Sequence, residues 1–512
     1  MSAPFYIIAR RLTAFAAVAT AAAMAPVVVA AQQPAAAQQP AAAQQPATAA
    51  ISLADALNMG LKVSHSVRTA MAGVNRAHGQ QIQARAQYLP QLNGIANYQR
   101  TFESQFAALS ATSSTPKTGT TPAPKDTTTN SLTNISKIFA SPSTFTFGLS
   151  LTQNLFTGGK LEAGSKGAEA ARTVAEINLD AARAQVALDV AQAYFDAVAS
   201  EQLVQIADST LAQAERTLAQ TTVSREVGSA AEFDLLRARV ARDNQKPAVI
   251  AARGNRDVAL LRLRQLLGIP LAQSLTLTTP IHDDGVAPAE PPPLTSPIAI
   301  PGRAGAITPD TSVAQRASVR QAAANLEAQE YSLRAAEWNR LPSLQLSSSY
   351  QRFAYPPAGT ILPAALNQYY PNWTASLGMS FPVFLGGKLT GDRMVAEANV
   401  VEARQQLEQT RELAALDART SLNQLAQAEA AYAASVGNSE QAAKAYSIAE
   451  VRFREGVSTQ VELLQSRTQY EQARVNRVTA ARDLEVARLR VAFLKDLPVG
   501  TGAATARPAT SR

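Results

Sequence analysis

The chain contains two copies of one pattern, and this internal duplication constrains its fold more than any other feature. Leu-Pro-Gln-Leu at Leu89–Leu92 recurs as Leu-Pro-Ser-Leu at Leu341–Leu344, an offset of 252 residues. The tripeptide Tyr-Gln-Arg follows at the same spacing in both copies and ends at Arg100 and Arg352. Such self-similarity predicts two copies of one supersecondary unit.

A second shared motif shows where the copies differ in length. Phe-x-Gly-Gly-Lys-Leu occurs at Phe156–Leu161 and again at Phe384–Leu389, an offset of 228 residues. The same offset relates Gly228 to Gly456, and this part of the register needs no gap. The second offset is smaller than the first because one loop of the first copy contains extra residues. Each copy is therefore predicted to be helix, strand, loop, strand, long helix, break and helix.

The N-terminal residues predict export. Arg10 and Arg11 precede an apolar run rich in Ala and Val that ends in small residues at Ala31. This order is typical of a secretory signal peptide over residues 1–31, with an uncleaved membrane anchor as the alternative. The chain has no cysteine, which excludes disulfides, thiolate metal sites, thiol nucleophiles and a lipid anchor on cysteine.

Low-complexity segments divide the rest of the chain. Residues 32–50 and 271–310 are predicted to be linkers, and residues 499–512 a flexible tail. The two copies occupy 51–270 and 311–498, which are rich in the residues of long helices. The formal net charge is +8, but the Lys and Arg residues are spread along these helices among Glu and Asp. This distribution favours solvated helix faces over a nucleic-acid surface.

Alternation of apolar and small polar residues predicts four β-strands, two in each copy. Along 144–156 and 372–383, successive side chains are expected on opposite faces of a sheet. Partner strands are expected at about 90–100 and 342–352. The residues predicted to face lipid are Phe145, Phe147, Leu149, Leu151, Trp373, Leu377, Met379 and Phe381.

Strands of this length with one apolar face are typical of a membrane β-barrel. A half-buried sheet in a soluble domain is the alternative, but no other apolar partner of domain size is evident for that face. Four strands cannot close a membrane barrel, and lipid does not tolerate open sheet edges, so several copies of the chain must contribute strands. The long loops at 101–143 and 353–371 are expected outside the cell.

A long helix is predicted after the second strand of each copy. From Lys160 to about Ser224 there is no proline, and apolar residues recur in steps of three and four, as in a coiled coil. A matching helix is expected at about 388–452. Each long helix meets a glycine-containing break and returns, at roughly 230–267 and 458–495. A helix of about 100 Å is too long for a compact domain, so the hairpins are predicted to form a tube. From the helices alone, an ordinary coiled-coil rod is the alternative.

With these elements in order, the sequence resembles the TolC-like outer-membrane efflux family. The resemblance covers about 51–270 and 311–498 and depends on the Ser52–Leu57 helix start, both Leu-Pro motifs, both Gly-Gly-Lys junctions and both glycine breaks. It implies a mainly α homotrimer with four strands from each protomer in a 12-stranded membrane β-barrel, continued by a long periplasmic α-helical barrel. It also implies an exit duct in the cell outer membrane that extends into the periplasm and contacts a periplasmic adaptor and an inner-membrane pump, for efflux or type I secretion, without a cofactor.

The resemblance places a gate and the adaptor contact at the periplasmic tip of the helices. The residues of this chain at the tip are Val227, Gly228, Asp234, Gly456 and Glu462. Three like charges converging on an axis would select cations. The alternative interpretation of each acid is an exposed residue near a helix N-terminus, where negative charge is favourable.

The tip departs from the family pattern at two positions. Gln465 occupies a position where some members have a second acid, and Ser458 one where some have a lock arginine. Arg225, Arg452 and Arg454 are then the candidates for a substitute lock.

Other functions fit the sequence less well. It forms no phosphate-binding loop, HExxH, GxSxG or histidine-paired nucleophile, so neither a catalytic nor a metal site is expected. A periplasmic coiled-coil scaffold or adaptor without channel activity is the alternative, but it leaves the four alternating strands unexplained. A simple porin would leave the helical tube without a purpose.

Overall fold

The structure is a computed structural model, and it describes most of the two copies. The described residues are 49–102, 143–229, 231–281, 312–355 and 370–499. The predicted signal peptide, most of the first linker, most of both outer loops, most of the second linker and nearly all of the tail lie outside these residues.

Helices of equal length occupy equivalent positions in the two copies. α2 (His65–Ala86) and α7 (Ala317–Trp338) each have 22 residues. α5 (Lys160–Glu226) and α8 (Lys388–Arg454) each have 67 residues, which corresponds to about 100 Å. The offsets found in the sequence therefore relate whole helices. Both predicted long helices are present in the structure. Within the described residues, no helix is both long and apolar enough to cross a membrane.

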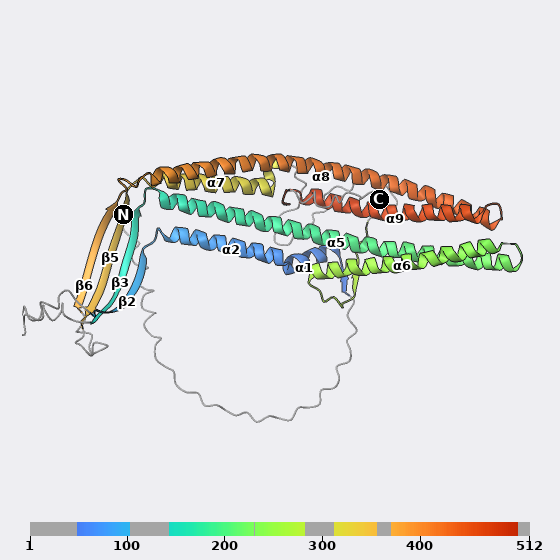
Figure 1. Ribbon diagram of the computed structural model, residues 1–512, viewed down its shortest axis with the longest axis horizontal. Coiled ribbons are helices and arrows are strands. Elements are labelled where there is room, and N and C mark those ends of the chain that lie inside the picture. Colours follow the sequence, from blue (N-terminus) through green and yellow to red (C-terminus); the bar gives the residue numbers. More distant parts are fainter. Residues whose placement is uncertain (1–48, 103–142, 230, 282–311, 356–369, 500–512) are drawn as a thin grey trace, which may run out of the picture. The chain divides into compact units, whose positions relative to one another are not determined.

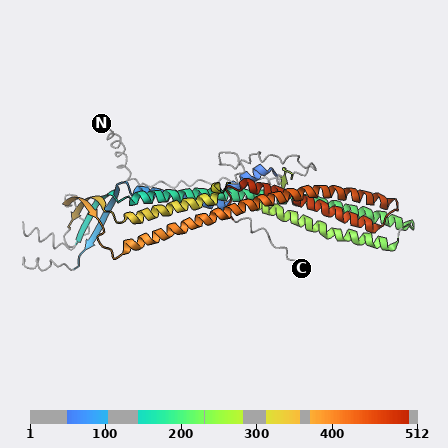
Figure 2. The ribbon, with the colours of Figure 1, turned by 90° about the horizontal axis from the view of Figure 1, so that it is seen from above.

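Four antiparallel strands form one sheet in the order β2-β3-β5-β6. They are β2 (Gln91–Arg100), β3 (Ser143–Phe156), β5 (Ser343–Ala354) and β6 (Tyr370–Ser380). All four predicted strands are thus present, and the two copies meet where β3 pairs with β5. β2 and β6 each keep one edge unpaired in this sheet. Figures 1 and 2 show the sheet at one end of the long helices and the hairpin breaks at the other.

Paired glycines form the junction between sheet and long helix in each copy. Gly158 and Gly159 have φ angles of 63° and 87°, and Gly386 and Gly387 have φ angles of 58° and 86°. Glycine adopts this left-handed backbone with little steric cost, whereas other residues are strained there. The repeated Gly-Gly motif therefore sets the same turn before α5 and α8.

α5 lies at the centre of the helical packing. It packs along α2, α6 (Glu232–Leu267), α7 and α9 (Gln460–Phe493), whereas α8 packs along α7 and α9. The main apolar core surrounds residues 184–206 of α5 and includes α1 (Leu53–Val63). Apolar residues of α5 at coiled-coil spacing are buried, namely Ile177, Ala184, Leu188, Ala191, Phe195 and Val198.

A small parallel sheet covers one side of this core. β1 (Ala49–Ile51) pairs with β4 (Leu275–Leu277), so short parts of both predicted linkers form strands. The Tyr194 hydroxyl donates a hydrogen bond to the Ile51 carbonyl at 3.2 Å and accepts one from the Thr279 amide at 2.9 Å. The structure differs from the predicted linkers here because a buried side chain satisfies the backbone of both segments.

The second copy contains a buried ion cluster that has no counterpart among the described residues of the first copy. The Arg316 side chain has no exposed surface, and its Nη2 lies 2.6 Å from Asp417 Oδ2. Arg490 Nη2 lies 3.4 Å from Asp417 Oδ1. Asp189, at the equivalent position of the first copy, is exposed and accepts a hydrogen bond from Gln185. Since Arg316 precedes α7, the cluster fixes the start of α7 against α8 and α9.

Candidate functional site

Each long helix ends in the same glycine turn at the end farthest from the sheet. Gly228 has a φ angle of 78° and Gly456 has a φ angle of 71°. In both turns the amide that follows the glycine donates to the carbonyl five residues earlier, at 2.8 Å. This pattern is the Schellman motif, in which left-handed glycine ends a helix. The two predicted breaks are therefore confirmed as equivalent turns.

The two acids predicted at the gate have different surroundings. Glu462 Oε1 lies 3.2 Å from Arg452 Nη1, across its own turn. Asp234 forms no ion pair with any described residue and lines a groove between the two hairpins. Both acids lie in the first turn of their helices, where the helix dipole favours negative charge. Of the two, Asp234 therefore has the carboxylate without an ion-pair partner among the described residues.

The groove between the hairpin ends has a volume of about 440 Å³. Besides Asp234, it is lined by Arg454, Ser458 and Gln460. Gln460 is only 5% exposed, and its Nε2 and Oε1 have no hydrogen-bond partner among the described residues. A buried amide without partners costs free energy, which a bound segment could recover. The groove thus combines opposite charges with unsatisfied hydrogen-bonding groups.

Two of the three candidate lock arginines form ion pairs within their own turns. Arg225 contacts Glu232, and Arg452 contacts Glu462. The side chains of both pairs are about half exposed, so each pair contributes roughly 0–1 kcal/mol. Arg454 instead lines the groove. The sequence did not reveal these pairs, because each joins side chains from the two helices on either side of a turn.

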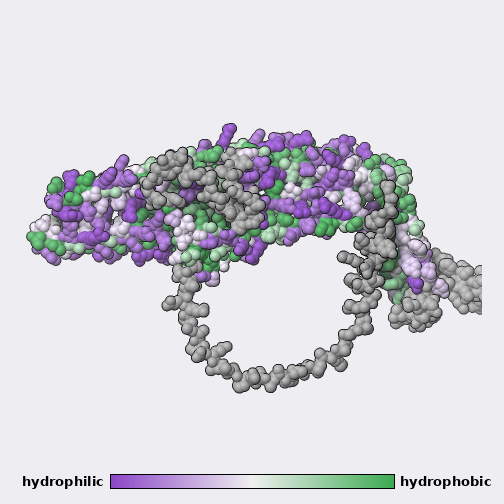
Figure 3. Space-filling model, turned by 180° about the vertical axis from the view of Figure 1, so that it is seen from behind, coloured by the Kyte–Doolittle hydropathy of each residue, from purple (hydrophilic) through white to green (hydrophobic). Residues whose placement is uncertain are grey.

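Large apolar side chains are exposed around both turns. Val227 is 74% exposed and Phe233 is 63% exposed. Figure 3 shows hydrophobic side chains among polar ones at the hairpin ends, on the left. Clustered exposed apolar groups mark surfaces that contact other proteins. The exposed apolar residues around the turns are Val223, Val227, Phe233, Leu236, Val451, Val457 and Val461.

At the other end of the helices, the predicted lipid-facing residues of the strands share one face of the sheet. Phe147 is directly opposite Ala96 on β2 and Arg352 on β5. Tyr350 is opposite both Leu149 and Trp373. Phe145 and Leu151 are half-buried and Phe381 follows β6 directly. The remaining predicted residues on this face are exposed: Phe147, Leu149, Trp373, Leu377 and Met379.

Burial shifts two titrating groups of α9. It raises the pKa of the Glu471 carboxyl, and it lowers the pKa of the Arg467 guanidinium one turn earlier. Arg467 is 7% exposed, and its Nε has no hydrogen-bond partner among the described residues. Across the same described residues, no three His, Asp or Glu side chains lie close enough to bind a metal ion.

Comparisons with known proteins agree with this architecture. The CmeC outer membrane channel of Campylobacter jejuni matches with a TM-score of 0.65 and 16% identity, over 92% of this chain and 94% of that chain. VceC of Vibrio cholerae, an outer membrane protein, matches with a TM-score of 0.61 and 18% identity, over 86% and 95%. The open state of the MtrE outer membrane channel of Neisseria gonorrhoeae matches with a TM-score of 0.60 and 19% identity, over 86% and 88%.

The sequence comparisons give the family. No curated protein matches the sequence significantly. The family model described as "Outer membrane efflux protein" matches residues 56–269 and 308–494, which correspond to the two copies and make up most of the chain. The resemblance inferred from the motifs is therefore confirmed, and the chain belongs to the outer membrane efflux protein family.

Proposed function

We propose that three copies of this chain form one closed exit duct, with a 12-stranded barrel in the outer membrane and a helical tube in the periplasm. The family assigns the chain to the outer membrane as an efflux channel. The unpaired edges of β2 and β6, strands of 10 and 11 residues, are the observation that supports a closed trimer. Because lipid offers no hydrogen bonds, β2 of one protomer must pair with β6 of the next.

Exposed apolar residues on α8 support the same assembly. Within the chain α8 packs along α7 and α9, and its buried residues Ala396, Val400, Ala403 and Leu407 recur in steps of four and three. Other apolar side chains of α8 remain exposed. A neighbouring protomer would cover this surface by coiled-coil packing. The exposed residues are Val395, Val401, Leu413, Leu416 and Leu422.

We place the adaptor contact and the gate at the tip, at Val227, Gly228, Asp234, Gly456 and Glu462. The exposed apolar side chains and the polar groove around these residues support docking of a periplasmic adaptor, which would connect the duct to an inner-membrane pump. The unpaired carboxylate of Asp234 supports a gate. Three such carboxylates around one axis would attract cations and repel one another. Cargo selection then belongs to the pump.

Cysteine cross-linking tests the pairing of β2 with β6, because the chain has no cysteine of its own. Asn93→Cys is combined in turn with Thr374→Cys, Ser376→Cys and Gly378→Cys, which lie on the matching face of β6. Oxidation should join neighbouring protomers into covalent trimers on denaturing gels. The control pairs Asn93→Cys with Ser150→Cys, directly opposite within one protomer, and should give monomers only. Monomers from every β2–β6 combination would contradict the trimer.

Planar-bilayer conductance tests the channel and its gate. The parent protein should give a small cation-selective current that grows or loses selectivity in the Asp234→Ala, Glu462→Ala variant. Glu226→Ala is the control, because it removes an exposed acid of the same region that lies outside the predicted gate and forms no ion pair with any described residue. A current unaffected by the double substitution would refute the gate and keep the channel. No current from a folded oligomer would favour the periplasmic scaffold or adaptor without channel activity.

A further inference from the structure

The repeated Tyr-Gln-Arg motif places two arginines on the four-stranded sheet. Arg100 ends β2, and Arg352 lies near the end of β5, both at the end of the sheet away from the helices. They are the charged residues of the described strands, which contain no acidic residue. Neither arginine forms an ion pair with any described residue.

Both arginines lie on the apolar face of the sheet. Side chains alternate along a strand, so each arginine shares a face with the tyrosine two residues earlier, and the intervening glutamine points to the other face. Tyr98 is directly opposite Phe145, and their ring centroids are 4.7 Å apart. Arg352 is directly opposite Phe147. The arginines are thus set among the side chains predicted to contact lipid.

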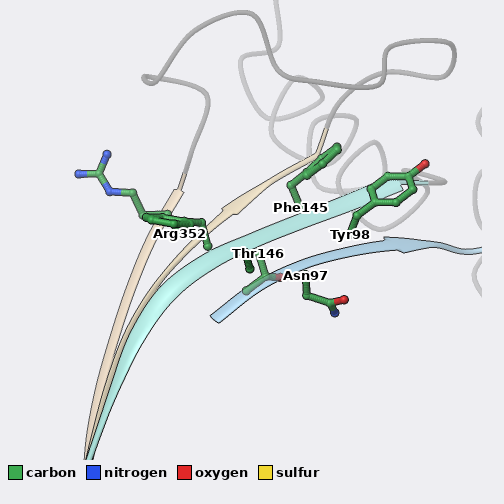
Figure 4. A pocket seen from close by; sticks show the side chains of 7 residues that line it. Asn97, Tyr98, Phe145, Thr146 and Arg352 are labelled. Atoms are coloured by element: carbon green, nitrogen blue, oxygen red, sulfur yellow. The ribbon is translucent and has the colours of Figure 1, made fainter. Parts of the chain in front are cut away.

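A cavity of about 430 Å³ lies beside these side chains. Figure 4 shows the rings of Tyr98 and Phe145 together on one side of the strands, with Asn97 pointing away and Arg352 extending from the neighbouring strand. Phe147 also lines the cavity. Its wall is therefore mainly apolar and carries one cationic side chain, as a site for a lipid with an anionic headgroup requires.

Aromatic rings hold the two guanidinium groups without neutralising them. Arg352 Nε donates a hydrogen bond to the Tyr350 hydroxyl at 3.0 Å, and its Cζ lies 5.9 Å from the ring centroid. Arg100 Cζ lies 5.6 Å from the Phe102 ring centroid. A positive charge on a lipid-facing surface is costly at the centre of a bilayer and far less costly near its headgroups. The two arginines are therefore tolerated near the headgroups, where both guanidinium groups keep their charge for an anionic partner.

The position of Arg352 along the sheet agrees with such a headgroup. From Phe156, beside the helix junction, to Phe147, opposite Arg352, β3 extends about 30 Å at 3.3 Å per residue. A tilt of about 45° converts this length to about 21 Å of depth, close to the ~25 Å apolar band of membrane barrels. Arg352 therefore lies near the outer boundary of the band, and Arg100 lies farther out.

We infer that the two Tyr-Gln-Arg motifs form a binding site for the headgroup phosphates of outer-leaflet lipid. Each guanidinium donates paired hydrogen bonds to phosphate oxygens, a geometry that arginine matches better than lysine. Acyl chains pack against Phe147 and Leu149. The inference rests on the proposed function, since it takes the apolar face of the sheet as the lipid-facing one.

Lipid retention by the full chain in phosphatidylcholine nanodiscs tests the site. The probe is lipid A with both phosphates, compared with the same lipid after enzymatic removal of the phosphates. The parent should retain the phosphorylated probe preferentially. Arg100→Gln and Arg352→Gln should each weaken retention about fivefold, and the double variant about 25-fold. Arg419→Gln, an exposed arginine of α8, is the matched control and should retain the probe like the parent.

Two further measurements separate this site from other effects. An Arg100→Lys, Arg352→Lys variant keeps the charge but loses the paired hydrogen bonds, so its preference should lie between those of the parent and the double glutamine variant. Such partial rescue excludes a folding defect as the cause of loss. Conductance is recorded on the same preparations. The lipid site would be overturned, and the channel kept, if the current were normal and the parent retained both lipids equally. The same conclusion would follow if the current were normal and the double glutamine variant retained the phosphorylated probe like the parent. Phosphate-dependent retention without current would support the site and refute the channel.

Discussion

Replacement of Asp417 by alanine should reveal the free energy of burying Arg316. The Arg316 side chain is fully buried, and its Nε and Nη1 have no hydrogen-bond partner among the described residues, so the Asp417 carboxylate is the group that compensates its charge. Removing one member of a buried ion pair costs about 3–5 kcal/mol, because the other charge is left uncompensated. We expect about 3 kcal/mol, since Asp417 is 12% exposed and water can reach the vacated space.

Hydrogen exchange measures this effect locally. The Ala317 amide, at the start of α7, donates to the Lys495 carbonyl at 2.8 Å, so loosening of Arg316 should open this contact. A loss of about 3 kcal/mol corresponds to a roughly 150-fold faster opening. The assay is exchange followed by mass spectrometry on peptides from the first turns of α7. Asp189→Ala, at the equivalent exposed position of the first copy, should change stability by less than about 0.5 kcal/mol.

Two results would refute this reasoning. If the Asp417→Ala variant exchanged hydrogen at the parental rate, some other group would have to compensate the charge of Arg316. Equal effects of Asp417→Ala and Asp189→Ala would mean that burial of the pair is irrelevant. An Arg316→Met, Asp417→Leu, Arg490→Met variant removes all three charges of the cluster and should exchange at close to the parental rate, because well-packed apolar residues replace buried charges at little cost. If it exchanged as fast as Asp417→Ala, lost packing rather than charge would be responsible.

Three further changes, and Gly79→Ala as a control for the first, follow from packing, hydrogen bonding and burial, all measured by unfolding of the purified protein. Gly60→Ala should destabilise by about 1–3 kcal/mol, because its Cβ would lie 2.6 Å from Val190 Cγ2. Gly79→Ala, which has open space around it, should stabilise by about 0.5–1 kcal/mol. Tyr194→Phe should cost about 1–3 kcal/mol, because the part-buried Thr279 amide loses its partner and the buried Ile51 carbonyl keeps only the bond from the Thr278 amide. Glu471→Gln should stabilise at neutral pH by less than about 1 kcal/mol, and less at acidic pH. Burial raises the folded-state pKa of Glu471, so stability falls as the pH rises from the unfolded-state pKa to the folded-state pKa.

Each change has an outcome that would contradict it. Equal midpoints for Gly60→Ala and the parent would mean that Val190 moves aside without cost. A parental midpoint for Tyr194→Phe would mean that water replaces the hydroxyl. A gain from Glu471→Gln that stays constant between about pH 4 and pH 7.5 would show that a cause other than ionisation produces it.

The strands and helices could be predicted because they depend on local patterns. The first long helix was expected from Lys160 to about Ser224 and extends to Glu226. Gly228 and Gly456 were expected to break the helices and do so, since a positive φ is a local property of the backbone. β1 and β4 escaped prediction because three residues are too few to show a period.

The ion pairs could not be predicted in the same way. Asp189 and Asp417 are the same residue at equivalent positions of the two copies, yet the contacts of α7 and α9 bury only the second. At the tip, pairing of Glu462 with Arg452 depends on the geometry of the turn between two helices. Which side chains meet is decided by tertiary contacts, and the repeated motifs carry no information about them.

The strand order has a consequence for how the chain folds. The centre of the sheet is the pairing of β3 with β5, and α5 and α6 lie between them in sequence. A chain exported from its N-terminus presents β2 and β3 alone until β5 arrives, and an isolated two-stranded hairpin is marginally stable. Contacts between residues so distant in sequence form slowly, whereas the helical hairpins depend on contacts closer in sequence. The helices are thus expected to form first and the sheet to assemble last, so that the apolar strands complete their pairing only when the rest of the protomer is in place.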